Sequence, residues 1–405
     1  MDILLLTKEF PPNIYGGAGV HVEHLAAELA RCDSGRHRLE VLCFGDQREA
    51  RPNASVRGIG PFGDMTDMAL WHPALLSDLS RNLVMAGTVQ SADIVHCHTW
   101  YTHLAGCLIK QLLQIPLVVT THSLEPQRPW KQEQLGNGYF AARWLEKMAL
   151  GNADGIIAVS TAMKDAILQL YDVPAEKVRV IYNGIDNDTF HKIDAPRILE
   201  AYGVDPKRPM VLFVGRITRQ KGIVHLLHAL HHVKRDFQMV LCAGAADTDQ
   251  IAQEVEVAVA KVRADTENPV IWIREMVPVD RLIALYSHAD VFVCPSVYEP
   301  FGIINLEAMA CQTPVVASAV GGIPEVVVHE ETGLLVPFEA VSPSDADPKD
   351  PQRFARDLAA AIDAVIGSPD MRARMGDAAR QRVDAHFSWR RIARRTISVY
   401  EEVKG

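Results

Sequence analysis

The chain has little of what secreted, membrane-spanning or nucleic-acid-binding proteins require. Its seven cysteines are an odd number without any CxxC pair, so the sequence predicts reduced, buried thiols. No uncharged apolar run approaches the ~20 residues of a membrane-spanning helix. The apolar run Met1–Leu6 is too short for a signal peptide and lacks a basic start. We therefore expect a cytoplasmic protein with no membrane partner.

Excess positive charge is also missing. The 405 residues include 41 lysines and arginines against 50 acidic residues, which gives a formal net charge of −9. Nucleic-acid backbones are bound by clustered positive charge, so we expect no nucleic-acid partner. The length is sufficient for about two domains. Whether the chain forms a homo-oligomer stays open.

Short runs rich in leucine and β-branched residues alternate with longer amphipathic segments, which is typical of parallel βαβ units. The strands expected in the first half are Ile3–Leu6, Leu39–Phe44, Ile94–His98, Leu117–Thr121, Gly155–Val159 and Val178–Tyr182. After the polar segment 186–207 the pattern restarts with Met210–Val214, Met239–Ala243, Val270–Ile273, Val291–Cys294 and Pro314–Ala317. We predict two doubly wound α/β domains, followed by a wholly helical segment after Pro348.

Ligands of such sheets bind beyond the carboxyl ends of the strands, so the loops after the first strand of each half are informative. Gly16 and Gly17 follow the first expected strand and precede a helix. Backbone amides at such a helix N-terminus can bind an anion. The loop is not GxGxxG, which argues against a dehydrogenase.

The first strand of the second half leads into Gly215, Arg216 and Lys221. A glycine at the strand end followed by two cations predicts binding of a diphosphate. A solvated basic loop is the alternative.

A third motif lies between an apolar strand and a helix. Glu299 precedes the helix, and Glu307 lies two turns inside it. Backbone amides at the start of this helix are available to phosphate or sugar oxygens. These amides belong to Phe301, Gly302, Ile303 and Ile304.

Glu299 and Glu307, together with Gly215, Arg216 and Lys221, resemble the donor site of glycosyltransferase family 4. The resemblance implies the retaining GT-B architecture, in which two Rossmann-like domains face each other across a cleft. It places an acceptor-side domain at 1–190, a nucleotide-sugar domain at 191–386, and a C-terminal helix at 387–405 that returns to the first domain.

A second set of residues resembles the glycogen synthase and α-maltose-1-phosphate synthase branch of this family. It comprises the stretches 121–126, 128–131, 134–136 and 183–186, with Tyr139. This resemblance implies a retaining α-1,4-glucosyltransferase of glycogen synthesis that uses ADP-glucose. Its acceptor would be glucose 1-phosphate, giving α-maltose 1-phosphate, or the non-reducing end of an α-glucan. Both acceptors and both ADP- and UDP-linked donors stay open.

The resemblance also assigns roles. Arg216 and Lys221 would hold the donor diphosphate, Glu307 the ribose, and Glu299 the sugar hydroxyls. Gly16 and Gly17 would supply amides to the phosphate, and His122 would bind the transferred sugar. The sequence further offers aromatic and basic residues for the acceptor, namely Trp100, Tyr101, Trp130, Lys131 and Arg143.

No metal or other cofactor is expected. Asp247 and Asp249 resemble the short acidic motif of metal-dependent transferases, but they lie outside the donor motifs and are expected to be surface charges. In His96-Cys97-His98 the strand alternation turns Cys97 away from both histidines, so this spacing does not predict a zinc site.

Other functions are weighed against this one. They are a family 4 transferase with a mannosyl donor or with a sucrose-type or inositol acceptor, a sugar-nucleotide epimerase, and a noncatalytic glucan-binding protein.

Overall fold

The computed structural model describes residues 1–63, 72–244, 246–342 and 345–405. The chain divides into two compact units. Unit 1 comprises Met1–Gly184 and Trp389–Gly405, and unit 2 comprises Ile185–Ser388. The divisions fall a few residues from the expected 190/191 and 386/387. The Ile185 amide donates to the Phe387 carbonyl at 2.8 Å, which ties together the two ends of unit 2.

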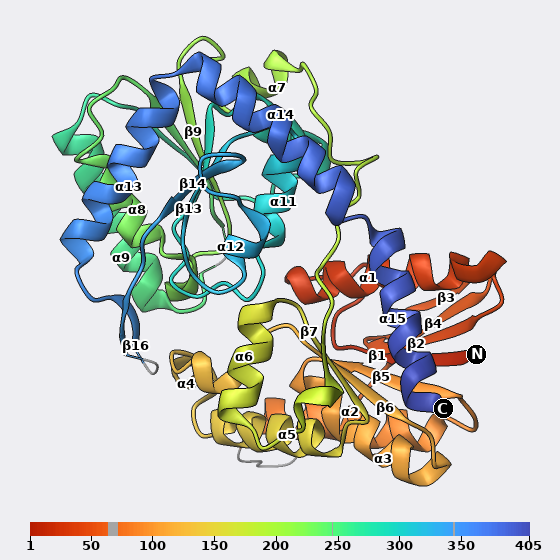
Figure 1. Ribbon diagram of the computed structural model, residues 1–405. Coiled ribbons are helices and arrows are strands. Elements are labelled where there is room, and N and C mark those ends of the chain that lie inside the picture. The colour runs from red at the N-terminus through yellow and green to blue at the C-terminus, as the bar shows by residue number, and fades with distance from the viewer. Residues whose placement is uncertain (64–71, 245, 343–344) are drawn as a thin grey trace. The chain divides into compact units, whose positions relative to one another are not determined.

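The described strands of unit 1 form one sheet in the order β3-β4-β2-β1-β5-β6-β7-β8, with every neighbouring pair parallel except β3 and β4 (Figure 1). The strands are β1 (Asp2–Leu6), β2 (Arg38–Phe44), β3 (Arg48–Arg51), β4 (Ala54–Ile59), β5 (Ile94–His98), β6 (Leu117–Thr121), β7 (Gly155–Ala158) and β8 (Val178–Val180). β5 and β6 are buried along their whole length, as expected for central parallel strands.

The helices of unit 1 are α1 (Gly17–Arg31), α2 (Pro73–Thr88), α3 (His103–Leu113), α4 (Lys131–Leu135), α5 (Gly138–Asn152), α6 (Thr161–Leu170) and α15 (Trp389–Lys404). α15 lies beside α1 (Figure 1). Its buried face includes Ile392, Ile397 and Tyr400, which share one core cluster with Leu25 of α1 and Val41 of β2. The expected return of the C-terminal helix to the first domain is confirmed.

The described strands of unit 2 form a parallel sheet in the order β11-β10-β9-β12-β13-β14. They are β9 (Met210–Val214), β10 (Gln238–Cys242), β11 (Val270–Ile273), β12 (Val291–Cys294), β13 (Val315–Ser318) and β14 (Gly333–Val336). A short antiparallel pair, β15 (Ala340–Ser342) and β16 (Asp345–Pro348), lies outside this sheet.

The helices of unit 2 are α7 (Pro196–Ala201), α8 (Ile223–Leu230), α9 (Asp249–Asp265), α10 (Val279–His288), α11 (Ile303–Ala310), α12 (Ile323–Val326), α13 (Pro351–Ile366) and α14 (Pro369–His386). Alternate strand residues such as Val211 and Phe213 pack against Leu226 of α8, Val259 of α9 and Leu358 of α13. The predicted pair of doubly wound sheets is therefore confirmed.

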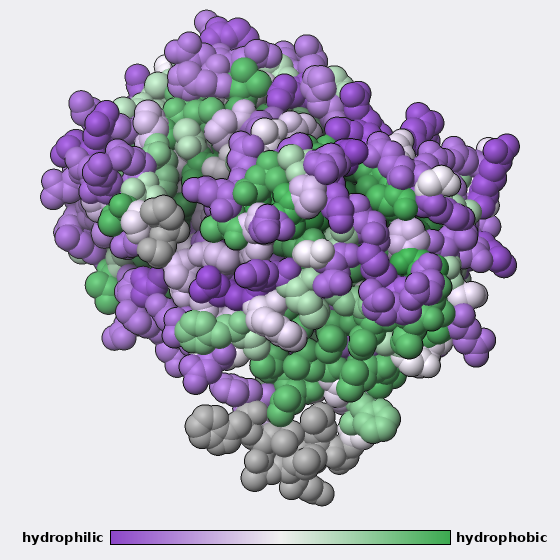
Figure 2. Space-filling model, turned by 60° about the horizontal axis from the view of Figure 1, so that its bottom comes forward, coloured by the Kyte–Doolittle hydropathy of each residue, from purple (hydrophilic) through white to green (hydrophobic). Residues whose placement is uncertain are grey.

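One face of unit 1 carries exposed apolar side chains. Leu83 of α2, Leu112 of α3 and Phe140 of α5 are more than half exposed, at 57%, 67% and 52%. Figure 2, in which the side of unit 1 bearing these helices comes forward, shows a hydrophobic area there. Within the described residues, no helix is both long and apolar enough to span a bilayer.

Candidate functional site

The strand order of unit 2 creates a topological switch point between β9 and β12. The chain leaves β9 toward β10 on one side and reaches β13 and β14 on the other. Loops that follow two such neighbouring strands diverge and leave a crevice at the carboxyl edge, where ligands of open α/β sheets bind. The loop after β9 carries Gly215, Arg216 and Lys221, and the loop after β12 carries Glu299.

Lys221 and Glu299 join these two loops. The Lys221 Nζ lies 2.6 Å from Glu299 Oε2, with side chains only 17% and 8% exposed. The Ser296 hydroxyl donates to the same oxygen at 3.2 Å. Burial acts most strongly and lowers the pKa of Lys221, but the charge and hydrogen bond of Glu299, together with Cys294, outweigh burial and raise this pKa above its usual value. A charged lysine is therefore kept at the switch point.

Arg216 directly follows Gly215, two residues beyond the end of β9. Its Nη1 lies 2.6 Å from Asp247 Oδ1, and the Asp247 side chain is 9% exposed. Asp247 is held in place because its amide donates to the Ile217 carbonyl at 3.0 Å. Asp247, expected to be a surface charge, is thus a buried partner of a predicted phosphate-binding arginine, while Asp249 begins α9.

The third predicted motif forms the start of α11. Gly302 has φ +99°, which a residue with a side chain rarely adopts, and it precedes the first helical residue, Ile303. Phe301 is buried, whereas Ile303 and Ile304 are half-buried at the helix N-terminus. This places the amides of the motif where the helix dipole favours an anion.

Glu307 lies farther along α11 and is half-buried. Burial raises the pKa of its carboxyl to about 7, although the Tyr286 hydroxyl donates to Glu307 Oε2 at 2.9 Å. The carboxyl of Glu307 is therefore close to its titration midpoint at neutral pH.

In unit 1, the glycine loop after β1 leads into α1. Gly17 is the first helical residue, and Gly16 precedes it in an extended conformation. The amides of Gly16 and Tyr15 each donate to Glu9 Oε2 at 2.8 Å. An anion that uses the Gly16 amide must therefore displace the Glu9 carboxylate.

His122 follows β6 directly and lies among other histidines of unit 1. Its Nε2 lies 3.1 Å from Nδ1 of His98, the last residue of β5. Burial, with His21 and His96 nearby, lowers the pKa of His122 well below the usual value. His122 is consequently neutral at pH 7, which suits hydrogen bonding to a sugar.

The buried carboxylate of Glu146 holds the loop after β6 in place by a hydrogen bond. Glu146 of α5 accepts from the Glu125 amide at 3.0 Å and from the hydroxyl of Tyr171. Burial raises the pKa of Glu146 to about 8, with a smaller contribution from Glu125. The Tyr139 hydroxyl donates to the Glu125 carbonyl at 2.7 Å, which fixes the same loop.

The residues predicted to bind an acceptor differ in how deeply their side chains are buried. Trp100 is 6% exposed and packs in a core cluster with Ala142 and Leu145, so it serves the core of unit 1. Tyr101 stacks on Trp100 with ring centroids 4.0 Å apart, and the Lys8 Nζ lies 3.8 Å from the centroid of its ring.

The other predicted acceptor residues are more accessible. Trp130 and Lys131 are half-buried at the start of α4. Arg143 of α5 is exposed, with its guanidinium 5.7 Å from the Tyr139 ring centroid. These three side chains and Tyr101 are thus at least partly exposed, in contrast to Trp100.

Comparison with known proteins places this geometry in a family. Residues 15–189 match the family model described as Glycosyltransferase Family 4, and residues 194–382 match the model for Glycosyl transferases group 1. The α-maltose-1-phosphate synthase of Mycobacterium tuberculosis (strain ATCC 25618 / H37Rv) is 48% identical over 408 residues, which cover 100% of both chains. The chain belongs to glycosyltransferase family 4.

Two further relatives agree with this membership. The α-maltose-1-phosphate synthase of Mycolicibacterium smegmatis (strain ATCC 700084 / mc(2)155) is 45% identical over 412 residues and also covers 100% of both chains. Among solved structures, sucrose-phosphate synthase from Thermosynechococcus elongatus has a TM-score of 0.79 and 27% identity, covering 99% of this chain and 98% of that one. The family 4 chain is accordingly a nucleotide-sugar-dependent glycosyltransferase with the GT-B type of domain fold.

The motifs of this family 4 member depend on residues that sequence reasoning did not single out. A Cβ on Gly321 would lie 2.1 Å from the Glu299 carbonyl oxygen, and the Gly322 amide donates to that oxygen at 2.9 Å. The loop after β13 thus holds the backbone of Glu299. Its signal in the sequence is a pair of glycines directly after an apolar strand.

Asn305 of α11 was also missed as a site residue. Its side chain is fully buried, and neither its Oδ1 nor its Nδ2 has a hydrogen-bond partner among the described residues. A Cβ on Gly302 would lie 2.6 Å from Asn305 Nδ2. Asn305 therefore packs against the backbone that begins the helix.

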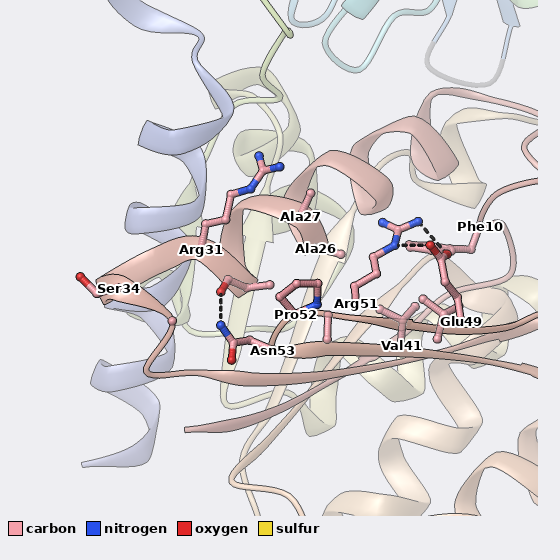
Figure 3. Close-up of a pocket in the computed structure, with 14 residues that line it drawn as sticks. Phe10, Ala26, Ala27, Arg31, Ser34, Val41, Glu49, Arg51, Pro52 and Asn53 are labelled. Carbon is pink, nitrogen blue, oxygen red and sulfur yellow. Dashed lines mark hydrogen bonds and ion pairs between the residues drawn. The ribbon is translucent and has the colours of Figure 1, made fainter.

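Unit 1 of this family 4 member also contains a cavity of about 530 Å³ between α1 and the edge strands of its sheet. Figure 3 shows Phe10, Ala26 and Val41 along it, with Arg51 paired to Glu49. The Arg51 guanidinium donates two hydrogen bonds of 2.8 Å to the Glu49 carboxylate. None of the predicted site residues lines this cavity.

Proposed function

We propose that this enzyme transfers glucose from ADP-glucose to glucose 1-phosphate, forming α-maltose 1-phosphate with retention of the α configuration. Extension of the non-reducing end of an α-glucan is the second acceptor reaction that belongs to this proposal. The observation that carries it is the buried pair of Lys221 and Glu299 at the switch point of unit 2. The names of the full-length relatives support the choice of acceptor.

The main chemical task is to stabilise the leaving nucleoside diphosphate. Its negative charge grows as the bond to the anomeric carbon breaks, and Lys221 and Arg216 are the cations of the switch-point loops. At ~4 Å and an effective dielectric near 20, one such contact is on the order of 4 kcal/mol before desolvation. The amides at the start of α11, from Phe301 to Ile304, are proposed to add hydrogen bonds.

The remaining assignments concern positioning. Glu307 is proposed to accept hydrogen bonds from the ribose, and Glu299 from the hydroxyls of the transferred sugar. His122 is proposed to bind this sugar as a neutral imidazole. In unit 1, Gly17 and, after displacement of Glu9, Gly16 are proposed to donate their amides to the phosphate.

Retention is proposed to follow from attack on the same face that the diphosphate leaves. The departing phosphate oxygen takes the proton of the attacking hydroxyl, so no protein nucleophile is required. Because Lys221 and Arg216 already supply positive charge, we propose that transfer needs no metal or other cofactor.

For the acceptor, we propose that Tyr101 and Trp130 contact sugar rings. Lys131 and Arg143 are the cations proposed to attract the phosphate of glucose 1-phosphate, whereas Trp100 supports Tyr101 from the core. A cytoplasmic location remains a prediction, and whether the chain forms a homo-oligomer stays open.

The alternative is a family 4 transferase with another acceptor. It is favoured by the D-inositol 3-phosphate glycosyltransferase of Corynebacterium efficiens, which is 28% identical and covers 96% of this chain.

A steady-state assay separates these functions. The purified enzyme is given ADP-glucose or UDP-glucose in chelator-treated buffer, with glucose 1-phosphate, glycogen or inositol 3-phosphate as acceptor. NMR then identifies the product and its anomeric configuration. We expect α-maltose 1-phosphate from ADP-glucose. A product formed only with inositol phosphate, or a β-linked product, would refute the proposal.

A further inference from the structure

Three histidines from separate segments of unit 1 lie together. They are His21 of α1, His98 at the end of β5, and His122 after β6. One ring nitrogen from each lies within 4.8 Å of the others. The ring centroids of His21 and His122 are 4.7 Å apart, and both other pairs are 5.4 Å apart.

Hydrogen bonding fixes the orientation of His21. Its Nδ1 lies 2.7 Å from Asn183 Oδ1, and both side chains are buried. Because an amide oxygen only accepts hydrogen bonds, Nδ1 carries the proton and Nε2 carries the lone pair. Nε2 has no hydrogen-bond partner among the described residues. Such an outer hydrogen bond is the arrangement that prepares a histidine to bind a metal ion.

The other two histidines already have a suitable spacing. His98 Nδ1 and His122 Nε2 are 3.1 Å apart. Two nitrogens that bind one tetrahedral Zn²⁺ at ~2.0–2.1 Å are about 3.3 Å apart. The metal ion would take the place of the shared hydrogen, and this proton would move to the other nitrogen of its own ring. His21 Nε2 would approach by a small shift that keeps the hydrogen bond between its Nδ1 and Asn183.

A neighbouring histidine shows what a purely structural role looks like. His96 lies on the same strand and is equally buried, but its Nδ1 lies 2.7 Å from the Tyr400 hydroxyl and its Nε2 2.7 Å from Thr120 Oγ1. Both of its nitrogens are therefore occupied. In contrast, the His21 Nε2 atom, which is a proposed ligand, is buried without a hydrogen-bond partner in the described part of the chain.

We propose that His21, His98 and His122 bind one divalent transition-metal ion of the Zn²⁺ class, and that the bound ion blocks glucosyl transfer by occupying His122. Three neutral imidazoles are ligands typical of Zn²⁺, Co²⁺, Ni²⁺ and Cu²⁺, and unsuited to Mg²⁺ or Ca²⁺. The inhibitory half rests on the proposed function, in which His122 binds the transferred sugar. The binding half does not.

Binding is tested with Co²⁺, whose visible absorption reports tetrahedral nitrogen coordination. The full-length wild-type protein is expected to bind one tight equivalent, which Zn²⁺ displaces. His21→Asn and His98→Gln should each weaken binding by at least about 100-fold, and Asn183→Ala by about 10- to 100-fold, because it removes only the outer hydrogen bond. His96→Gln is the matched control and should bind as the wild type does.

Far-UV circular dichroism identifies any variant that fails to fold. If the histidine variants do not fold, Asn183→Ala still tests the site, because it retains all three ligands and removes only the outer hydrogen bond. A wild-type protein without tight Co²⁺ binding, or folded His21→Asn and His98→Gln variants with unchanged affinity, would overturn the site.

Inhibition is measured separately with ADP-glucose and glucose 1-phosphate. Zn²⁺ should inhibit the wild type reversibly, with recovery after chelation, and should inhibit His21→Asn much less at the same total concentration. Equal inhibition of both proteins would overturn the inhibitory half. A wild type that binds Co²⁺ but transfers no glucose to any acceptor would instead refute the proposed function and leave the metal site supported.

Discussion

Removing the charge of Lys221 should impair folding and catalysis for different reasons. Lys221→Met keeps most of the aliphatic stem but leaves Glu299 without its 2.6 Å partner in a position only 8% exposed. Breaking a buried ion pair on one side costs about 3–5 kcal/mol, because the remaining charge stays desolvated. That is a large fraction of the roughly 5–15 kcal/mol that stabilises an ordinary protein.

The double variant Lys221→Met/Glu299→Gln separates the two effects. It removes both charges, and the amide oxygen introduced in place of the carboxylate would still accept the hydrogen bond that Ser296 donates at 3.2 Å. We expect it to recover most of the lost stability, since replacing both partners of a buried pair is often close to neutral. Its turnover should stay at least about 100-fold below that of the wild type if Lys221 supplies ~3 kcal/mol to the transition state.

Urea denaturation followed by circular dichroism measures the stability of the wild type, both single variants and the double variant. Hydrogen exchange of peptides from β9 and β12 assigns the transition to unit 2. A Lys221→Met variant as stable as the wild type would refute the energetic argument. A double variant with near-normal turnover would refute the role of Lys221 in stabilising the leaving group.

Three further predictions concern single carboxyl groups. Since burial raises the pKa of Glu307 to about 7 and a ribose hydroxyl donates best to an ionised carboxylate, ADP binding should weaken as the pH falls below about 7. Because the terminal phosphate of ADP itself titrates with a pKa of about 6, calorimetry should show a steeper slope in the wild type than in Glu307→Gln; equal slopes would contradict the ribose assignment. Asp247→Asn weakens the 2.6 Å ion pair that orients Arg216 and should lower kcat by about tenfold with little change in circular dichroism; unchanged kcat would exclude a positioning role. Glu146 has a folded pKa of about 8, above its unfolded value of about 4.3, so its contribution to stability is full below pH 4 and is lost as the pH rises toward 8. The difference in melting temperature, Glu146→Gln minus wild type, should therefore increase between pH 5 and pH 9. A difference that does not change with pH would contradict the raised pKa.

The parts of the fold that could be predicted from the sequence are those with a local cause. Central strands such as β5 and β6 are continuous apolar runs because both of their faces are buried. The edge strand β3 reads Arg-Glu-Ala-Arg and was not predicted, because its pairing with β4 leaves most of its residues exposed. Its strand character comes from its neighbour.

The site residues likewise divide into those that local sequence predicts and those that depend on contacts between distant segments. Lys221 and Glu299 could be named from the loops that follow apolar strands, because strand ends in a parallel sheet share one edge. The partnership of Arg216 with Asp247 could not, since it depends on how the loop after β10 returns to the loop after β9. Similarly, the neighbours of His98 along its strand did not predict a metal site. The contacts of His98 with His21 and His122 join three segments that are distant in the sequence.

The way α15 completes unit 1 has a consequence for synthesis on the ribosome. Unit 2 is continuous in the chain, whereas unit 1 needs residues 389–405, including Tyr400 against His96, to finish its core. During translation unit 2 can therefore complete its folding first. Until α15 is synthesised, part of the apolar surface of unit 1 stays exposed. A nascent chain that stalls before α15 would display this surface to chaperones and proteases, although its donor-site unit is already folded.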